Sequence, residues 1–278
     1  AHNLGEKNDS TFTNDLHKDK KVDFIMANPP FNLKGWRTED ELTEDPRFKG
    51  YSVMPPVANA NYAWILHMIS KLDVSHGIAG FLLANGALNA DGVEYTLRKE
   101  IIEKDRVEAI IILPRDMFYT VDLSATLWIV NMNKKAGTIN GRHVRDRSNE
   151  ILFMDLRSFN ENIEEIQIDK GKRKKKTVLT DSQIEYITGV FRSWQSADDN
   201  SYSDIAEFCQ AASLEDIRAK DYSLAPSKYI KFIDHDLDID YEKEMNRIQK
   251  EMQNIMISEK ASQNMLEDAF RGIGYGID

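Results

Sequence analysis

The chain has 278 residues, of which 41% are hydrophobic, so it can bury a sizeable core in one large domain or two smaller ones. Its formal net charge of −10 argues against a chain that binds nucleic acid through a broad basic surface without a partner protein. One cysteine, Cys209, excludes an intrachain disulfide and a cysteine-rich zinc site, and we expect no metal. No apolar run reaches membrane-spanning length, so we expect a cytoplasmic protein without a membrane partner.

The first predicted element is a strand over residues 22–27, within the stretch VDFIMANPPFNLKGW. Its apolar, β-branched and aromatic content is typical of a strand buried on both faces in a parallel sheet. It ends at Asn28-Pro29-Pro30-Phe31, where two prolines cannot donate to a ladder and direct the chain rigidly out of the sheet. Ligands of open α/β sheets bind beyond the carboxyl ends of strands, so this turn is a candidate site. The alternative is a strand terminator followed by a chance aromatic residue.

The next 130 residues alternate between strands and helices. A polar segment over residues 32–59 has no sustained period, which is typical of a functional loop. Helices are predicted over 61–72 and 93–105, and strands over 78–84, within 106–118 where Pro114 ends one, and within 124–135. This order predicts a mostly parallel sheet with helices on both faces and a last strand that runs antiparallel. Because only 21 residues precede Val22, we interpret the chain as a fragment of such a fold.

Residues 149–238 form a second predicted region. A strand precedes the basic run Lys172 to Lys176, and a helix begins after Thr180. The basic run could bind phosphate, but a solvated hairpin or loop is favoured because no aromatic residue is interleaved with it.

A long helix is predicted over residues 241–271 and defines a third region, 239–278, after 1–148 and 149–238. Its apolar residues recur at spacings of three and four and are interrupted by a polar heptad with Glu259 and Ser262. This pattern predicts a coiled-coil seam or one stripe of a helical bundle, and a helix folded back on its own domain is the alternative. The seam residues are Met245, Ile248, Met252, Ile255, Leu266 and Ala269.

The tetrapeptide, with the blocks NYAWILHMISKL, GIAGFLLANGAL and LRKEIIEKDRVEAIIILPRDMFYTVDLSATLWIVNMNK in this order, resembles the methylation subunit of type I restriction-modification systems. Those subunits are adenine-N6 DNA methyltransferases. The resemblance covers nearly the whole chain, although the family's glycine-rich cofactor loop and helical N-terminal domain have no counterpart in these residues. It implies an α/β fold: a partial Rossmann-like S-adenosylmethionine-dependent methyltransferase sheet, mostly parallel with an antiparallel last strand, and a C-terminal helical extension.

The resemblance also implies roles for single residues. The Asn28 side-chain oxygen and the Pro29 carbonyl would accept the two N–H groups of the adenine amine, next to the cofactor S-adenosylmethionine. Pro30 would stiffen the turn, and Phe31 would stack on a base that has left the duplex.

Four further residues are candidates for contacts with the base or with DNA. Phe118 or Tyr119 would form the second wall of the base site. Lys34 and Trp36 would contact the DNA backbone or anchor the loop.

Implied partners are double-stranded DNA, a specificity subunit, a restriction subunit and a second methylation subunit. Two other functions stay open: methylation of a protein glutamine or an RNA base with the same Asn-Pro-Pro-Phe chemistry, and a catalytically incomplete fragment that keeps only assembly surfaces.

Overall fold

The computed structural model describes residues 10–118, 124–139, 141–169, 172–233, 240–272 and 274–275. Its contacts divide the chain into two compact units, residues 1–232 and 233–278. Of the expected region boundaries, the one after residue 148 falls inside the first unit. The one after residue 238 lies outside the described residues.

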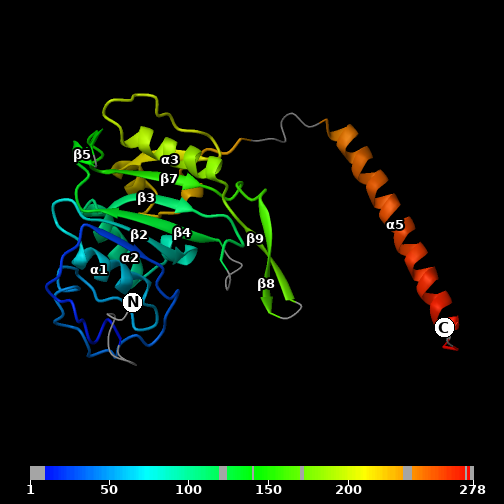
Figure 1. Cartoon of the computed structure of the whole chain (residues 1–278), viewed down its shortest axis with the longest axis horizontal. Coiled ribbons are helices and arrows are strands. Elements are labelled where there is room, and N and C mark those ends of the chain that lie inside the picture. The colour runs from blue at the N-terminus through cyan, green and yellow to red at the C-terminus, as the bar shows by residue number, and fades with distance from the viewer. Residues whose placement is uncertain are drawn as a thin grey trace. The chain divides into compact units, whose positions relative to one another are not determined.

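A six-stranded sheet forms the centre of the first unit (Figure 1). Its order is β1 (Phe24–Ala27), β2 (Ile78–Ala84), β4 (Ala125–Asn131), β3 (Val107–Ile112), β7 (Glu150–Asp155) and β10 (Cys209–Ser213). The pairs β1–β2 and β3–β7 are parallel, whereas β4 pairs antiparallel with both β2 and β3, and β10 pairs antiparallel with β7. Strands β1, β2, β3 and β7 therefore run in one direction, which confirms the expected mostly parallel sheet with an antiparallel β4.

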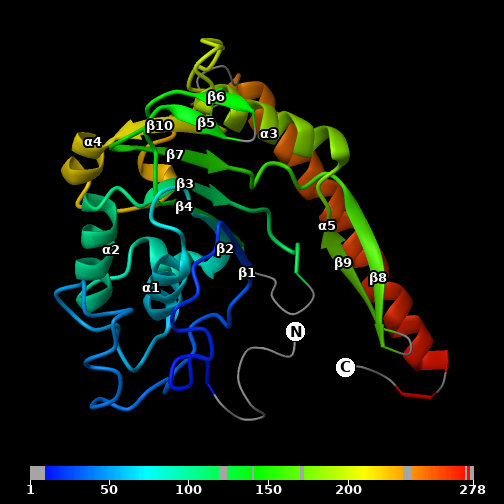
Figure 2. The same cartoon turned by 60° about the vertical axis from the view of Figure 1, so that its left-hand side comes forward.

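Helices cover both faces of this sheet (Figure 2). On one face, α1 (Asn61–Lys71), the short 3₁₀ turn η1 (Asn85–Leu88), α2 (Val93–Glu103) and α4 (Leu214–Ala219) enclose the larger core cluster. On the other face, α3 (Asp181–Gln195) covers the smaller cluster. Strand β7 shows the alternation that separates the clusters, because Phe153 belongs to the first and its neighbours Leu152 and Met154 to the second.

Two hairpins stand apart from the sheet. The first joins β5 (Gly137–Ile139) to β6 (Arg142–Val144), and the second joins β8 (Ile163–Asp169) to β9 (Lys172–Thr177). The basic run thus lies on a hairpin strand, which is the structure that the sequence favoured. After it, α3 begins with a capping box in which the Thr180 hydroxyl accepts from the Gln183 N–H and the Gln183 side chain accepts from the Thr180 N–H. A short 3₁₀ turn, η2 (Pro226–Lys228), follows α4.

The prediction that β1 is buried on both faces is wrong for this structure. Among the described strands, β1 lies at the edge of the sheet and pairs with β2 alone, and on one face α3 packs over the β3 and β7 side of the sheet rather than over β1. The side chains of Phe24 and Met26 point to that uncovered face and are 62% and 94% exposed. An apolar run alone predicts a strand, but its burial depends on partners far away in the sequence.

The second unit contains α5 (Tyr241–Gly272). None of its residues is buried, and the predicted seam is open to solvent, with Met245 57%, Ile248 39%, Met252 58%, Ile255 65% and Leu266 56% exposed. Among the described helices, none combines the length and apolar character needed to cross a membrane.

Candidate active site at the carboxyl end of β1

The carboxyl ends of β1, β2, β3 and β7 meet at one edge of the sheet because these strands run in the same direction. Residues 28–31 follow β1, the η1 turn follows β2, and residues 113–118 follow β3 at this edge. The sheet therefore brings the Asn-Pro-Pro-Phe turn and the loop that carries Phe118 to the same side, as the sequence predicted for ligand-binding loops.

The turn offers two hydrogen-bond acceptors. Pro29 is buried, whereas Asn28 and Pro30 are exposed and Phe31 is half-buried. Within the described residues, neither the Asn28 carboxamide nor the Pro29 carbonyl oxygen is engaged in a hydrogen bond. Both oxygens thus retain unused acceptor capacity within the described residues, and the Asn28 side chain is exposed. The two proline rings and the buried Pro29 restrict how far the oxygens can move relative to one another.

Asn32 and Asn61 lock the turn onto the start of α1, a feature that the sequence reasoning missed. Asn32 has a φ of +53°, in the left-handed region that asparagine tolerates better than most residues. Its N–H donates to Asn61 Oδ1 over 3.0 Å, and Asn61 Nδ2 donates back to Asn32 Oδ1 over 2.8 Å. Asn61 is 1% exposed. Two features of the sequence could have indicated this pair: an asparagine directly after the tetrapeptide and another at the first residue of the next helix.

Further hydrogen bonds join the neighbouring loops of the same edge. The hydroxyl of the buried Tyr62 donates to the Ala87 carbonyl in η1 over 2.7 Å. Burial raises the pKa of Tyr62 above its ordinary value, so this hydroxyl keeps its proton and remains a donor. Asn85 Oδ1 accepts from the Thr126 hydroxyl over 2.6 Å and so ties the end of β2 to the start of β4. These bonds fix the framework around the turn.

Trp36 does not offer a surface to DNA. It is 5% exposed, and its indole N–H donates to the Pro56 carbonyl over 2.8 Å. Its ring packs against Phe12 and Phe48, with ring centroids 4.6 Å and 5.9 Å away. Of the two roles considered for Trp36, this burial and packing favour the loop anchor. Lys34, two residues earlier, is exposed.

A polar cluster connects the loop that carries Trp36 to helix α1. The guanidinium of Arg47 pairs with Asp45 over 2.6 Å and donates to His67 Nδ1 over 3.1 Å, while Asp15 pairs with Lys71 over 2.5 Å. Burial, together with the nearby Arg47, lowers the pKa of His67 to about 4, so His67 is neutral at pH 7. Burial opposes ionisation of Asp15, but hydrogen bonds from Lys71 and the His17 N–H outweigh it and hold its pKa below the usual value.

The second wall of the base site rests on Phe118 alone among the described residues, because Tyr119 lies outside them. Phe118 is half-buried against the smaller core cluster, and the described ring contacts do not join it to Phe31. Three strand spacings, about 14 Å, separate β1 from β3 in the sheet. The two loops must therefore converge over the edge if both rings are to flank one base.

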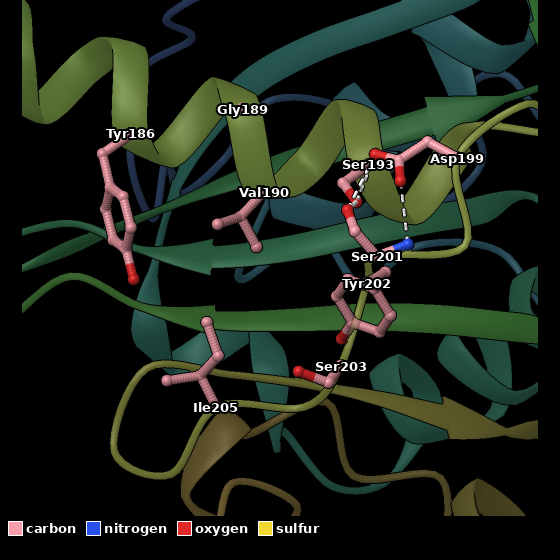
Figure 3. Close-up of a pocket in the computed structure, with 9 residues that line it drawn as sticks. All are labelled: Tyr186, Gly189, Val190, Ser193, Asp199, Ser201, Tyr202, Ser203 and Ile205. Atoms are coloured by element: carbon pink, nitrogen blue, oxygen red, sulfur yellow. Dashed lines mark hydrogen bonds between the residues drawn. The ribbon is translucent and has the colours of Figure 1, made fainter.

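The remaining candidate sites fit the chemistry less well. Among the described residues, no group of three or more His, Cys, Asp or Glu residues could hold a metal ion. A cavity of about 380 Å³ lies between α3 and the segment 199–205 (Figure 3). At one end, the Ser193 hydroxyl is hydrogen-bonded to Ser201 over 2.9 Å, and Tyr186 lies at the other end. Asp199 also accepts from the Ser193 and Ser201 hydroxyls, so these three polar side chains bond to one another at that end of the cavity.

The chain is similar to known methylases. Residues 1–237 match the sequence model of the family described as N-6 DNA Methylase. The chain is 38% identical over 230 residues to the methylase subunit of the type I restriction enzyme HindI from Haemophilus influenzae, covering 82% of this chain and 46% of that protein. It is 30% identical over 270 residues to the MjaIX methylase subunit from Methanocaldococcus jannaschii, covering 96% of this chain and 45% of that protein. The chain thus spans about half the length of these curated relatives.

Solved structures share the fold. A type I restriction-modification methyltransferase subunit from Streptococcus thermophilus superimposes with a TM-score of 0.65 at 24% identity, covering 81% of this chain and 42% of that one. The EcoKI M protein superimposes with a TM-score of 0.54 at 17% identity, covering 94% and 56%. The expected partial methyltransferase sheet with a C-terminal helix is confirmed.

Proposed function

The chain belongs to the N-6 DNA methylase family, and from this premise we propose that the natural protein carrying it is the methylation subunit of a type I restriction-modification system. In this proposal it transfers a methyl group from S-adenosylmethionine to N6 of an adenine in duplex DNA. The observation that carries the proposal is the Asn28-Pro29-Pro30-Phe31 turn at the carboxyl end of β1, with two unengaged acceptors held in place by the Asn32–Asn61 pair.

The acceptors address the difficulty of the reaction. The exocyclic amine of adenine is a poor nucleophile because its lone pair is conjugated into the ring. When Asn28 Oδ1 and the Pro29 carbonyl each accept one N–H, they orient the amine. They also favour a lone pair localised on N6, which attack on the methyl group requires. Neither group titrates near neutral pH, so the site is a preorganised electrostatic site that needs no charged base of its own.

Phe31 supports the same chemistry from the side of the base. An amine inside a duplex is out of reach, and extruding the base costs a few kcal/mol. Stacking on an aromatic ring returns about 1–3 kcal/mol per base. Phe31 is half-buried, so part of its side chain remains accessible for such a contact.

The cofactor proposed here supplies an electrophilic methyl group. Asn28 and Pro29 are the residues of this chain that we place next to it, because the exposed Asn28 lies where the parallel strands end and where ligands of open α/β sheets bind. No metal is part of the proposal.

Partners follow from the same premise and remain part of the proposal. The exposed apolar stripe of α5 suits docking against helices of a specificity subunit, since it is unburied along its whole length. Such a subunit would also explain how a chain with a net charge of −10 serves a DNA enzyme. The proposed assembly also contains a restriction subunit and a second methylation subunit. We propose that it is located in the cytoplasm.

The test is methyl transfer by the natural protein, assembled with its specificity subunit, on duplex DNA. Asn28→Ala removes one of the two acceptors, and we expect the rate to fall by about 10²-fold or more, by analogy with the loss of one oxyanion-hole donor. The matched control is Asn200→Ala, an exposed asparagine away from this edge, which should keep the parent rate. Transfer at the parent rate by the Asn28 variant would refute the proposed site.

A further inference from the structure

The β8–β9 hairpin concentrates positive charge in an acidic chain. Residues 163–177 contain six Lys or Arg and three Asp or Glu, although the whole chain has a net charge of −10. Arg173 and Lys175 share the exposed face of β9, and the Arg173 side chain is 76% exposed. Only Glu165, 3.3 Å from the Arg173 guanidinium, forms an ion pair on this face among the described residues. The positive charge is thus concentrated on β9, which contains residues 172–176.

The basic strand β9 is rooted closer to the Asn-Pro-Pro-Phe turn than the acidic strand β8. At the root of β9, the Thr177 N–H donates to the Asp116 carbonyl in the loop after β3. Near the root of β8, the Phe159 ring packs against Phe208, which precedes the outermost strand β10, with ring centroids 5.5 Å apart. The acidic Glu164 and Glu165 are thus on the outer strand.

The hairpin and the Asn-Pro-Pro-Phe turn share one edge of the sheet. Strand β7, which leads into the hairpin, has the same direction as β1, so both features follow carboxyl ends. Four strand spacings, about 19 Å, separate β1 from β7. That span corresponds to roughly 5–6 base pairs at 3.4 Å per pair. Seven residues in β8 make the hairpin about 24 Å long. The hairpin can therefore follow a duplex whose target base lies at Phe31.

We propose that β9 is a phosphate-binding strand, on which Arg173 and Lys175 contact the backbone of the DNA duplex about half a helical turn from the target adenine. The inference rests on the proposed function, because DNA is its ligand. The contact is electrostatic and independent of base sequence, since contacts to phosphate oxygens position a protein on the duplex but carry no direct sequence information. It supplies local positive charge where the chain otherwise repels DNA.

The experiment compares two charge-reversal variants of the natural protein in its assembled complex. Arg173→Glu with Lys175→Glu changes the proposed strand. Lys135→Glu with Arg142→Glu makes the same charge change at exposed positions in and beside the β5–β6 hairpin, which follows the carboxyl end of the antiparallel β4 and so lies at the opposite edge. Binding of a duplex that contains the target site is measured over a range of salt concentrations, together with kcat at saturating DNA.

We expect the β9 variant to bind DNA at least tenfold more weakly at low salt. The slope of log K against log salt should become shallower by about 1.8, which is the loss of two phosphate contacts. Its kcat at saturating DNA should equal that of the parent, and the β5–β6 variant should keep the parent slope. An unchanged slope in the β9 variant, equal losses in both variants, or lost subunit assembly with unchanged DNA binding would each overturn the inference. If the parent complex itself does not bind DNA, the proposed function fails, and the phosphate-binding role fails with it.

Discussion

Asn61 is a buried amide whose hydrogen bonds all serve the neighbouring loop. It accepts from the Asn32 N–H and donates to the Asn32 side chain, so it stabilises a left-handed residue directly after Phe31. A non-glycine residue in this region costs on the order of 1 kcal/mol or more unless its surroundings enforce it. The pair therefore positions the turn without touching a substrate.

Asn61→Ala should lower kcat for methyl transfer while leaving a folded protein. We expect a loss of about 1–3 kcal/mol in unfolding free energy, because Asn32 loses its partners. Asn61→Asp keeps the acceptor for the Asn32 N–H and should restore part of the rate. Steady-state kinetics and urea unfolding of both variants check this expectation. If the two variants showed equal rates and both matched the parent, the positioning role would be wrong.

Phe31 should act through the face of its ring. Phe31→Ala should cost about 1–3 kcal/mol of stacking on the extruded base, whereas Phe31→Tyr and Phe31→Trp should be tolerated. A fluorescent base analogue at the target position reports extrusion directly. Equal fluorescence for the alanine variant and the parent would remove Phe31 from the base site.

The elements differ in how far their sequences determine them. The Thr180 capping box defines the start of α3 because its two partners, Thr180 and Gln183, are only three residues apart, and β2 matches its predicted bounds because Gly and Asn flank an apolar run. Burial of β1 and of Trp36 could not be predicted, since it depends on whether distant segments cover them. The Asn28 turn was predictable from its prolines. Its Asn32–Asn61 lock was not, because 29 residues separate the partners.

Helix α1 carries a group whose titration affects stability below neutral pH. Burial lowers the pKa of His67 to about 4, whereas in the unfolded chain it lies near 6.5. Between these values the unfolded chain binds the proton and the folded chain does not, so stability is complete above pH 6.5 and falls as the pH drops toward 4. At pH 5 we expect a loss of about 1–2 kcal/mol.

Urea unfolding at pH 7 and pH 5 measures this loss. His67→Gln removes the titrating group but can still accept a hydrogen bond from Arg47. The variant should therefore lose less stability than the parent between the two pH values. Identical pH dependence in both proteins would show that His67 is not responsible.

The exposed stripe of α5 allows the assembly proposal to be tested by substitution. Ile248→Asp with Ile255→Asp places two charges on the exposed stripe of α5. Since α5 buries no residue, the melting temperature of the isolated chain should not change, while co-purification with the specificity subunit should be lost. Gln249→Asp with Gln253→Asp, on the same exposed helix but off the stripe, is the matched control and should preserve the complex. A lower melting temperature with an intact complex would contradict the docking role.

Identification of the methylated product shows which atom receives the methyl group. The natural protein, assembled with its specificity subunit, is incubated with duplex DNA and S-adenosylmethionine labelled in the methyl group. The DNA is digested to nucleosides, and the labelled species is identified by mass spectrometry. We expect the label in N6-methyladenine, with the yield strongly reduced by Asn28→Ala. Label in N4-methylcytosine, in RNA or in a protein glutamine, with none in adenine, would contradict the proposed function.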